Sequence, residues 1–307
     1  MDLLQYKSPM VFYTEDEIKG ILDSHGIKVE QLFDYIKIIK DWLKTQPHIP
    51  LEPSDRQIAY FLLMNKFSIE NTKLKLDMNY TIKGLIPDYY NKPPSHPDIQ
   101  RTLKFAHWGL LPNLTKKLNR VLVWRLVNAE DLDVTLLFSS YCFLFELKTI
   151  LDFNKSDEIV FDMSYFPLSV VAKFNPMDVK RILTILEKVY SNRIAAFHFV
   201  KLPTHAQSLI KLVKMFLKPK IRERMIFHDD YDTLHDYFDV DQLPKEFNGN
   251  GKSLAEIHEQ TKKIIMDHED HLTKVFSARV NEDLRPTKLT NDDLLGFYGN
   301  FKQLDFD

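Results

Sequence analysis

The chain of 307 residues contains little glycine, with 8 Gly, and a single cysteine, Cys142. One cysteine cannot form an internal disulfide, which argues against a disulfide-stapled secreted domain and fits a reducing compartment. Phosphate-binding loops need several glycines, and neither of their motifs, G-x-x-x-x-G-K-[ST] and G-x-G-x-x-G, occurs in the chain. We therefore expect a cytoplasmic protein that does not bind nucleotides through such loops.

Long hydrophobic runs are also missing. The most apolar run, Leu136 to Phe145, is interrupted by two serines and is much shorter than the roughly 20 residues of a bilayer-spanning helix. The N-terminus shows no cationic stretch followed by an apolar segment, which is the pattern of a secretory signal. This composition predicts a soluble protein that has at most peripheral contact with membranes.

Neither sign of charge dominates, since 41 Lys and Arg face 43 Asp and Glu for a net charge of −2. Such a balance argues against a surface dedicated to nucleic-acid phosphates. We expect no nucleic-acid partner, and any anionic partner has to meet a local basic patch.

Recognisable catalytic motifs are absent from the sequence. The nucleophile motif G-x-S-x-G does not occur. No H-E-x-x-H or C-x-x-C motif accompanies His198, His205 or His228. His268 and His271 lie among acidic residues and fit a solvated face better than a metal site. We therefore predict no enzyme, no metal and no cofactor, although a site assembled from distant residues would leave no motif.

Bulky apolar side chains are abundant: the chain holds 22 Phe, and 12% of its residues are aromatic. The first block, residues 14–46, has helical spacing, and Thr14 with Glu17 forms a capping box. Further helical patterns cover residues 55–67 and 68–82. Prolines 93, 94 and 97 then interrupt the pattern, so we place a domain boundary there.

Short β-branched or aromatic runs alternate with helical patterns after this boundary. Strands are predicted at 121–127, 158–163, 195–200 and 224–228, and helices at 133–151, 176–190, 204–217 and 254–276. This alternation predicts an α/β fold with a mostly parallel sheet. We expect an N-terminal helical domain at 1–92, an α/β domain at 93–250, and a helical extension with a loosely held tail at 251–307.

Four segments between Glu158 and Gly249 resemble the CRAL-TRIO lipid-binding family, which includes tocopherol- and retinal-binding proteins and yeast phosphatidylinositol exchangers. They are similar to four family motifs, in chain order. These are a strand that ends in Phe-Asp, the last central strand with its turn, the basic stretch after the helix that closes the cavity, and the Leu-Pro motif that ends the domain. In this sequence they read IVFD (159–162), AFHFV-K-LP (196–203), KMFL…KIRERM (214–225) and LPKEFNG (243–249). The chain departs from the family pattern at Lys201, Met215 and Asn248.

The resemblance implies a sheet that floors an apolar cavity closed by a movable helix. The helix 204–217 matches this gate: its apolar stripe is Leu209, Leu212, Val213 and Phe216, and lysines form one edge. A helix packed permanently on the core would show the same pattern. The resemblance implies ligand-binding roles for Phe138, Tyr141, Cys142, Phe145, Phe161, Phe166, Ile185, Leu186, Tyr190, Ile194, Phe197, Leu209 and Val213.

Basic residues gather around the end of this helix. Between Lys211 and Arg224 there are six basic residues and one acid, Glu223, and each basic residue near an anionic leaflet contributes about 1 kcal/mol. A solvated basic face is the alternative reading. The resemblance implies contact with membranes or phosphoinositides at Arg193, Lys211, Lys214, Lys218, Lys220 and Arg224.

The sequence thus predicts a soluble, monomeric lipid-binding and transfer protein that holds one small hydrophobic ligand and releases it at anionic membranes. The many rings suit a retinoid, tocopherol, carotenoid or terpenoid at least as well as two acyl chains. A phospholipid or phosphoinositide exchange protein is the first alternative, and an enzyme acting on a lipid is the second.

Overall fold

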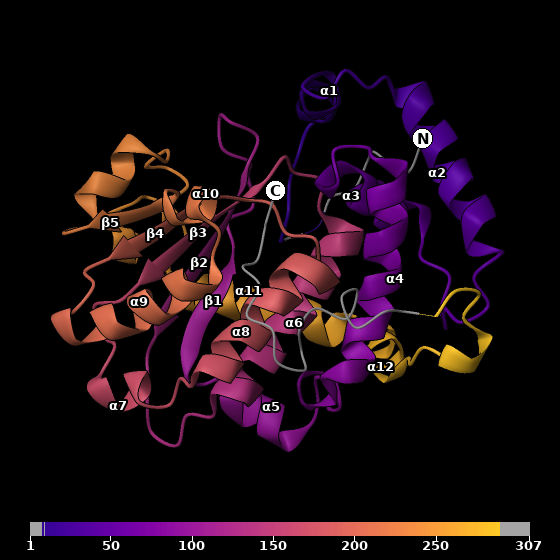
Figure 1. Ribbon diagram of the computed structural model, residues 1–307. Coiled ribbons are helices and arrows are strands. Elements are labelled where there is room, and N and C mark those ends of the chain that lie inside the picture. The colour runs from indigo at the N-terminus through magenta and orange to yellow at the C-terminus, as the bar shows by residue number, and fades with distance from the viewer. Residues whose placement is uncertain (1–7, 9, 289–307) are drawn as a thin grey trace.

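The computed structural model describes residue 8 and residues 10–288; the predicted tail beyond 288 lies outside this range. Figure 1 shows the N-terminal helices to one side of a five-stranded sheet, with α6 and α8 between them. The N-terminal helices are α1 (Glu15–Asp23), α2 (Val29–Leu43), α3 (Asp55–Met64) and α4 (Ile69–Leu85).

The segment 14–46 is helical as predicted, and it forms two helices joined by a turn. Thr14 caps α1 through the expected capping box with Glu17. The chain then turns at Gly26, whose φ of +66° lies in the left-handed region that glycine adopts without a steric penalty. Apolar side chains of α1 and α2 share a buried cluster with Tyr60, Phe61 and the rest of α3.

The sheet confirms the predicted α/β fold and contains one strand that the sequence pattern missed. Its order is β1-β2-β3-β4-β5, and the missed strand β1 pairs antiparallel with β2 while the other pairs are parallel. Gly109 in β1 lets helix α11 pack closely, since an added Cβ would lie 2.5 Å from Thr261 Oγ1. The strands are β1 (Ala106–Leu110), β2 (Arg120–Leu126), β3 (Asp157–Asp162), β4 (Ile194–Val200) and β5 (Met225–His228).

One row of paired positions carries an aromatic ring in all five strands: Trp108, Trp124, Phe161, Phe199 and Phe227. Neighbouring rings of this row approach to 5.3 Å between Phe161 and Phe199 and 5.4 Å between Phe199 and Phe227. Because side chains alternate along a strand, this row gives one face of the sheet a continuous aromatic surface.

Helices cover that aromatic face. The chief one is α6 (Val134–Leu151), whose first turn is capped by Asp133. Of the described helices, α6 alone is long and apolar enough to cross a membrane, but 78% of it is buried in the protein, as in the core helix of a soluble protein. The others are α5 (Pro97–Thr102), α7 (Leu168–Val171), α8 (Pro176–Thr184), a π-helical turn η2 (Ile185–Val189), α9 (Gln207–Phe216) and α10 (Pro219–Arg222).

The opposite face packs on the C-terminal part of the chain. A second apolar cluster joins Val121, Val160 and Val200 of the sheet to Phe247 and Ile257. The predicted helix at 254–276 is divided at His268 into two helices. These elements are α11 (Leu254–Asp267), α12 (Glu269–Ser277) and the short turns η1 (Pro87–Tyr89), η3 (Thr204–Ala206), η4 (Asp232–Asp236), η5 (Lys245–Phe247) and η6 (Glu282–Leu284).

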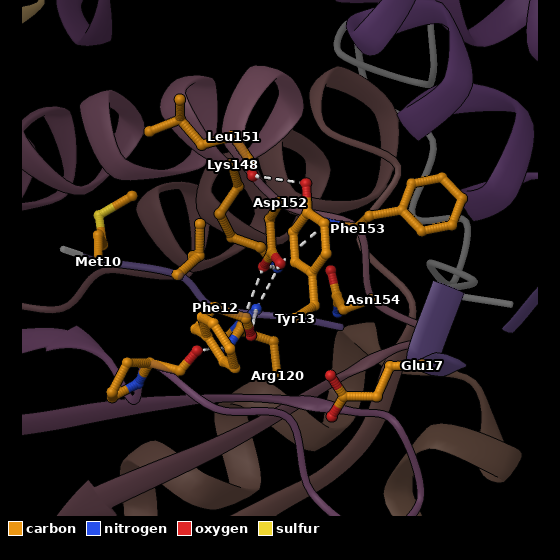
Figure 2. Close-up of polar contacts among 12 residues, drawn as sticks. Met10, Phe12, Tyr13, Glu17, Arg120, Lys148, Leu151, Asp152, Phe153 and Asn154 are labelled. Atoms are coloured by element: carbon orange, nitrogen blue, oxygen red, sulfur yellow. Dashed lines mark hydrogen bonds and ion pairs between the residues drawn. The ribbon is translucent and has the colours of Figure 1, made fainter. Parts of the chain in front are cut away.

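A buried ion-pair network fastens the N-terminal segment to the sheet (Figure 2). Arg120 donates from Nε and Nη2 to both carboxylate oxygens of Asp152, at 3.0 and 2.8 Å, and from Nη1 to the carbonyl of Leu111 at 3.0 Å. Tyr13 donates to the carbonyl of Leu151 at 3.4 Å, and Lys148 pairs with Asp157. The network ties the segment before α1 to the end of α6 and the start of β3.

Candidate functional site

An apolar cavity of about 230 Å³ lies between the aromatic face of the sheet and helices α6, α8 and α9. Its floor is formed by Trp124 of β2, Phe161 of β3 and Phe199 of β4. Apart from tryptophans and Tyr141, its lining side chains are aliphatic, phenyl or thioether groups. Such a wall excludes water and suits an apolar guest.

Nine of the thirteen residues proposed for ligand binding line this cavity. The three from α6 recur at i, i+3 and i+7, which places them on one side of the helix. The nine are Phe138, Tyr141, Phe145, Phe161, Phe166, Leu186, Phe197, Leu209 and Val213.

Cys142 does not line the cavity, contrary to the expectation. It follows Tyr141 in α6, so its side chain points about 100° further round the helix. Its carbonyl accepts a hydrogen bond from Tyr190 at 3.1 Å. Burial raises the pKa of the Cys142 thiol to about 12, so this thiol is protonated and unreactive at neutral pH.

Ile185, Tyr190 and Ile194 also lie outside the cavity wall. The chain of α8 widens into the π-helical turn η2 at Ile185, which changes the direction of the following side chains, and η2 packs on α4. The Tyr190 ring lies behind Phe145, with 5.6 Å between ring centroids. Ile194 begins β4 and borders a different, basic pocket.

Several wall residues escaped the sequence reasoning. Trp108 belongs to the missed strand β1, and Phe199 lies two residues after Phe197 on the same face of β4. The two-residue period of a strand would have identified Phe199. Trp108, Gly109, Leu122, Val123, Trp124, Val134, Leu137, Leu144, Ile159, Met163, Phe174, Val179, Ile182, Leu183, Phe199, Ile210 and Met225 complete the lining.

Helix α9 closes the cavity on one side through Leu209, Ile210 and Val213. The predicted helix at 204–217 starts later than expected: residues 204–206 form the 3-10 turn η3, and neither η3 nor α9 has a side-chain cap. The helix ends before Lys218, because Pro219 disfavours the helical conformation for the residue that precedes it.

A basic pocket of about 320 Å³ lies at the amino-terminal ends of β4 and β5. It brings together three predicted residues, Arg193, Lys220 and Arg224, and adds Lys66, which the sequence reasoning missed. Lys66 comes directly after α3 and has a φ of +55°. Ser156, Ile194 and Ala195 complete its lining.

A histidine in the turn between α1 and α2 accepts a hydrogen bond from one arginine of this pocket. Arg193 Nη1 lies 3.2 Å from His25 Nε2, and His25 Nδ1 lies 3.0 Å from the carbonyl of Ile21. Because a guanidinium only donates, Nε2 accepts and the ring proton is assigned to Nδ1. Burial and the positive charges of Arg193, Lys155 and Lys66 lower the pKa of His25, which keeps this ring neutral at pH 7.

The other predicted basic residues lie along α9 and its end rather than in the pocket. Lys211 is exposed, and Lys214 and Lys218 are half-buried. Lys214 Nζ lies 5.3 Å from the centre of the Phe227 ring, within reach of a cation–π interaction. Large apolar side chains are exposed on and near these elements: Met215 (68%), Leu168 (62%), Phe227, Tyr165 and Met177.

A chain of polar groups crosses the opposite face of the sheet. His198 Nε2 lies 3.3 Å from Glu158 Oε2, and His198 Nδ1 lies 2.9 Å from His228 Nε2. His228 Nδ1 in turn lies 2.7 Å from the hydroxyl of Thr233, and Asn119 donates to Glu158 at 2.7 Å. Throughout residues 10–288, no three His, Cys, Asp or Glu side chains are placed to hold a metal ion.

A family model for the CRAL/TRIO domain matches residues 107–249. Residues 107–249 are therefore assigned to the CRAL-TRIO family. The match covers α6, α9, strands β2 to β5 and all of β1 except its first residue. A second model, the Pinta-like UBA domain, matches residues 28–99.

All residues that line the apolar cavity, from Trp108 to Met225, therefore fall within the matched CRAL/TRIO range. A CRAL/TRIO domain in this part of the chain implies a lipid-binding or lipid-transfer protein.

Curated relatives resemble the chain over most of its length. Clavesin-1 of Xenopus laevis is 25% identical over 227 residues, which span 72% of this chain and 68% of the relative. Clavesin-2 of Homo sapiens is 25% identical over 237 residues, which span 72% of this chain and 69% of the relative. The crystal structure of Sfh5 aligns with 85% of this chain and 100% of its own, at 15% identity and a TM-score of 0.44.

Proposed function

We propose that the chain is a cytoplasmic, monomeric carrier that holds one small hydrophobic molecule behind α9 and releases it at anionic membranes. The observation that carries this proposal is the apolar cavity of about 230 Å³ beneath α9. We expect its ligand to be of the retinoid, tocopherol, carotenoid or terpenoid type, and we expect no catalytic turnover.

The size and the walls of the cavity support a single rigid ligand over a phospholipid. A volume of about 230 Å³ lies below the usual range of ligand pockets, which is roughly 300–1,000 Å³. Aromatic rings such as Trp124, Phe161 and Phe199 stack well on conjugated or ring-containing molecules. Two flexible acyl chains would need more room than this state of the protein provides.

The placement of α9 supports a gated route to the cavity. The segment that carries α9 starts at Lys201, whose φ of +53° is uncommon for a residue with a side chain, and ends at Lys218, before Pro219. A change of backbone angles at these two points would swing α9 away from Phe199. A membrane would favour the open state only by binding it more tightly than the closed one.

The surface around α9 supports release at a membrane. Met215 on α9 and Leu168 on α7 are the most exposed large apolar side chains among the described residues. Lys211 and Lys214 lie on the same helix as Met215. Apolar side chains that enter the interface and lysines that meet anionic headgroups make a reversible peripheral contact.

The basic pocket supports attraction to anionic lipid headgroups during this contact. We predict that Lys220→Glu combined with Arg224→Glu leaves ligand retention unchanged and slows transfer to acidic vesicles at least about threefold, because each lost basic contact weakens docking by about 1 kcal/mol. The measurement is ligand transfer from the protein to phosphatidylcholine vesicles with and without phosphatidylserine.

The control for this experiment is Lys37→Glu combined with Lys44→Glu, which makes the same change of charge at an exposed position of α2 and at the exposed residue that caps its C-terminal end. Transfer at the wild-type rate by this control and slow transfer by the pocket variant support the proposal. Equal rates for the pocket variant and the wild type would contradict a role for the basic pocket.

A phospholipid or phosphoinositide exchange protein remains the second candidate, favoured by the basic pocket at Arg193, Lys220 and Arg224. The two candidates differ in what they carry. Exchange of a labelled phospholipid between vesicles that competes with an isoprenoid would favour this second function, whereas isoprenoid transfer without phospholipid exchange favours the first.

A further inference from the structure

The wall of the apolar cavity, as formed by the described residues, has no polar atom that is accessible from inside the cavity. Only three of its side chains carry an N–H or O–H group, those of Trp108, Trp124 and Tyr141. Trp124 donates from Nε1 to the phenol oxygen of Tyr141, so these two groups bond to each other. Trp108 is buried, and its indole nitrogen is inaccessible. None of the three side chains therefore presents a hydrogen-bonding group to a guest.

The backbone of the wall presents no such group either. Most wall residues lie in helices or strands, whose amide and carbonyl groups bond to one another. Two wall residues in loops have their backbone groups engaged elsewhere. The amide of Met163 donates to the carbonyl of Val200 at 2.8 Å, and the carbonyl of Phe166 accepts from His205 Nε2 at 2.7 Å.

This wall penalises any ligand that places a polar group inside the cavity. A hydroxyl or carbonyl group that enters would lose its hydrogen bonds to water and gain none from the protein. Burial of such a group without a partner weakens binding by a factor of about 5 to 100. A hydrocarbon has no hydrogen bonds to lose, and its apolar contacts with the wall are the same.

We propose that the cavity prefers pure hydrocarbons, such as hydrocarbon terpenes, over alcohols and aldehydes with the same skeleton. This inference rests on the proposed carrier function and narrows its class of ligand. The preference arises because the wall lacks a partner for a polar group, and no single residue recognises the ligand. Retinoids and tocopherols each carry an oxygen, so they suit this wall less well than a hydrocarbon terpene does.

Three molecules with the same C15 skeleton test the proposal: farnesene is a hydrocarbon, farnesal carries a carbonyl group and farnesol carries a hydroxyl group. The full chain is incubated with phosphatidylcholine vesicles that contain equal amounts of the three and is then separated from the vesicles by gel filtration. Mass spectrometry after solvent extraction gives the amount of each molecule on the protein. The vesicles are the reference because their interface keeps the polar groups of farnesal and farnesol hydrated.

We expect the ratio of farnesene to farnesol on the protein to exceed the ratio in the vesicles at least about tenfold. Farnesal should lie between the two, because a carbonyl only accepts hydrogen bonds and therefore loses fewer of them than a hydroxyl does. This comparison uses the wild-type protein and does not depend on the folding of any variant.

Two variants supply the missing partner inside the cavity. Val213→Thr replaces a methyl group of the wall with a hydroxyl, and Met163→Gln replaces a thioether side chain with an amide of similar length. Each should lower the enrichment of farnesene over farnesol at least about threefold, because farnesol gains one hydrogen bond. Val127→Thr is the matched control: Val127 is exposed and lies outside the cavity wall, so this variant should keep the full enrichment.

A protein-bound ratio equal to the ratio in the vesicles would show that the polar end keeps its hydrogen bonds, and this result would overturn the hydrocarbon preference while leaving the carrier function intact. An enrichment that Val213→Thr and Met163→Gln both retain in full would also overturn it, because the missing partner would then not be the cause. Absence of all three molecules from the protein would instead contradict the carrier function itself, and the inference with it.

Discussion

We expect a charged side chain introduced at Val213 to weaken ligand retention strongly. Its side chain is half-buried on α9 and lines the cavity. Val213→Asp would place a carboxylate against an apolar wall, where an unpaired charge is costly, so that α9 could close only by leaving this group in water. We predict that this variant loses bound ligand at least about tenfold faster than the wild type.

The measurement is the fraction of ligand that stays with the protein during gel filtration. Ser208→Asp serves as the matched control, because Ser208 is exposed on the same helix. Equal retention by Val213→Asp, Ser208→Asp and the wild type would show that α9 does not seal the ligand.

Some residues of the cavity wall could be predicted from the sequence, and others could not. The resemblance to the CRAL-TRIO family pointed to Phe138, Tyr141 and Phe145, and their helical spacing places them on one side of α6. Trp108 was missed because β1 is a short edge strand that contains Gly109, a residue that strand patterns disfavour. Gly109 allows α11 to pack closely against β1, and no local sequence pattern reveals this contact.

At the scale of single elements, the short strand β5 depends on a neutral histidine. Glu158 as a carboxylate only accepts, so His198 donates to it from Nε2, while His198 Nδ1 and His228 Nε2 share a hydrogen bond that continues the chain to Thr233. Burial and the neighbouring His198 lower the pKa of His228, and Asp230 and Asp236 oppose this shift. Hydrogen bonds from His198 and Asn119 outweigh burial and lower the pKa of Glu158, for which Lys117 also contributes.

This arrangement predicts a loss of stability in acid. Because the pKa of His228 is lower in the folded than in the unfolded protein, the unfolded state takes up the proton first as the pH falls below about 6.5. The free energy of unfolding should therefore fall between pH 7 and pH 5. His228→Gln should reduce this slope by at most about 1.4 kcal/mol per pH unit, as measured by denaturant unfolding at each pH.

His235→Gln is the control for this titration, since His235 is exposed in η4 next to the same polar chain. The control should keep the wild-type slope. An unchanged slope in His228→Gln would show that His228 does not carry the expected part of the pH dependence.

Elements were predicted best where their local signals agree with their packing. The helix predicted from residue 176 starts there, because Asn175 caps α8 and Pro176 occupies its first turn. The π-helical turn after it was not foreseen, because the extra residue per turn is stabilised by packing on α4, through bonds such as that from Asn79 to the carbonyl of Val189 at 2.7 Å.

At the scale of the whole molecule, a buried ion pair joins the N-terminal helices to the α/β domain. Lys83 of α4 donates to Glu146 of α6 at 2.7 Å, and both side chains are fully buried. Gln57 of α3 donates to the same carboxylate at 3.2 Å, and Asn79 accepts from Lys83 at 3.0 Å. Removal of one partner would leave an uncompensated charge in the interior.

We predict that Glu146→Ala lowers the free energy of unfolding by about 3–5 kcal/mol, because the Lys83 ammonium then lacks its counter-charge. The combination of Lys83→Met with Glu146→Leu should recover most of this loss, since it removes both charges and keeps the volume. Chemical denaturation measures both. A double variant as unstable as the single one would show that the charges themselves are not the cause.

At the scale of the whole chain, the alternation of strands with helices and the motifs of the CRAL-TRIO family predicted the architecture. The segments around Phe161, Phe197 and Leu243 indicated the α/β fold, and the structure has it. The contact between α4 and α6 was not foreseen, because Lys83 shows no apolar pattern and its partner lies 63 positions away. Long-range polar pairs of this kind leave no local signal.

The most direct test of the account is native mass spectrometry of the full chain purified from cells, with lipid identification after solvent extraction. The account predicts one small hydrophobic molecule bound per chain, lost in Val213→Asp and retained in Ser208→Asp. A protein that carries no such molecule, and takes up no added retinoid, tocopherol or farnesene, would contradict it.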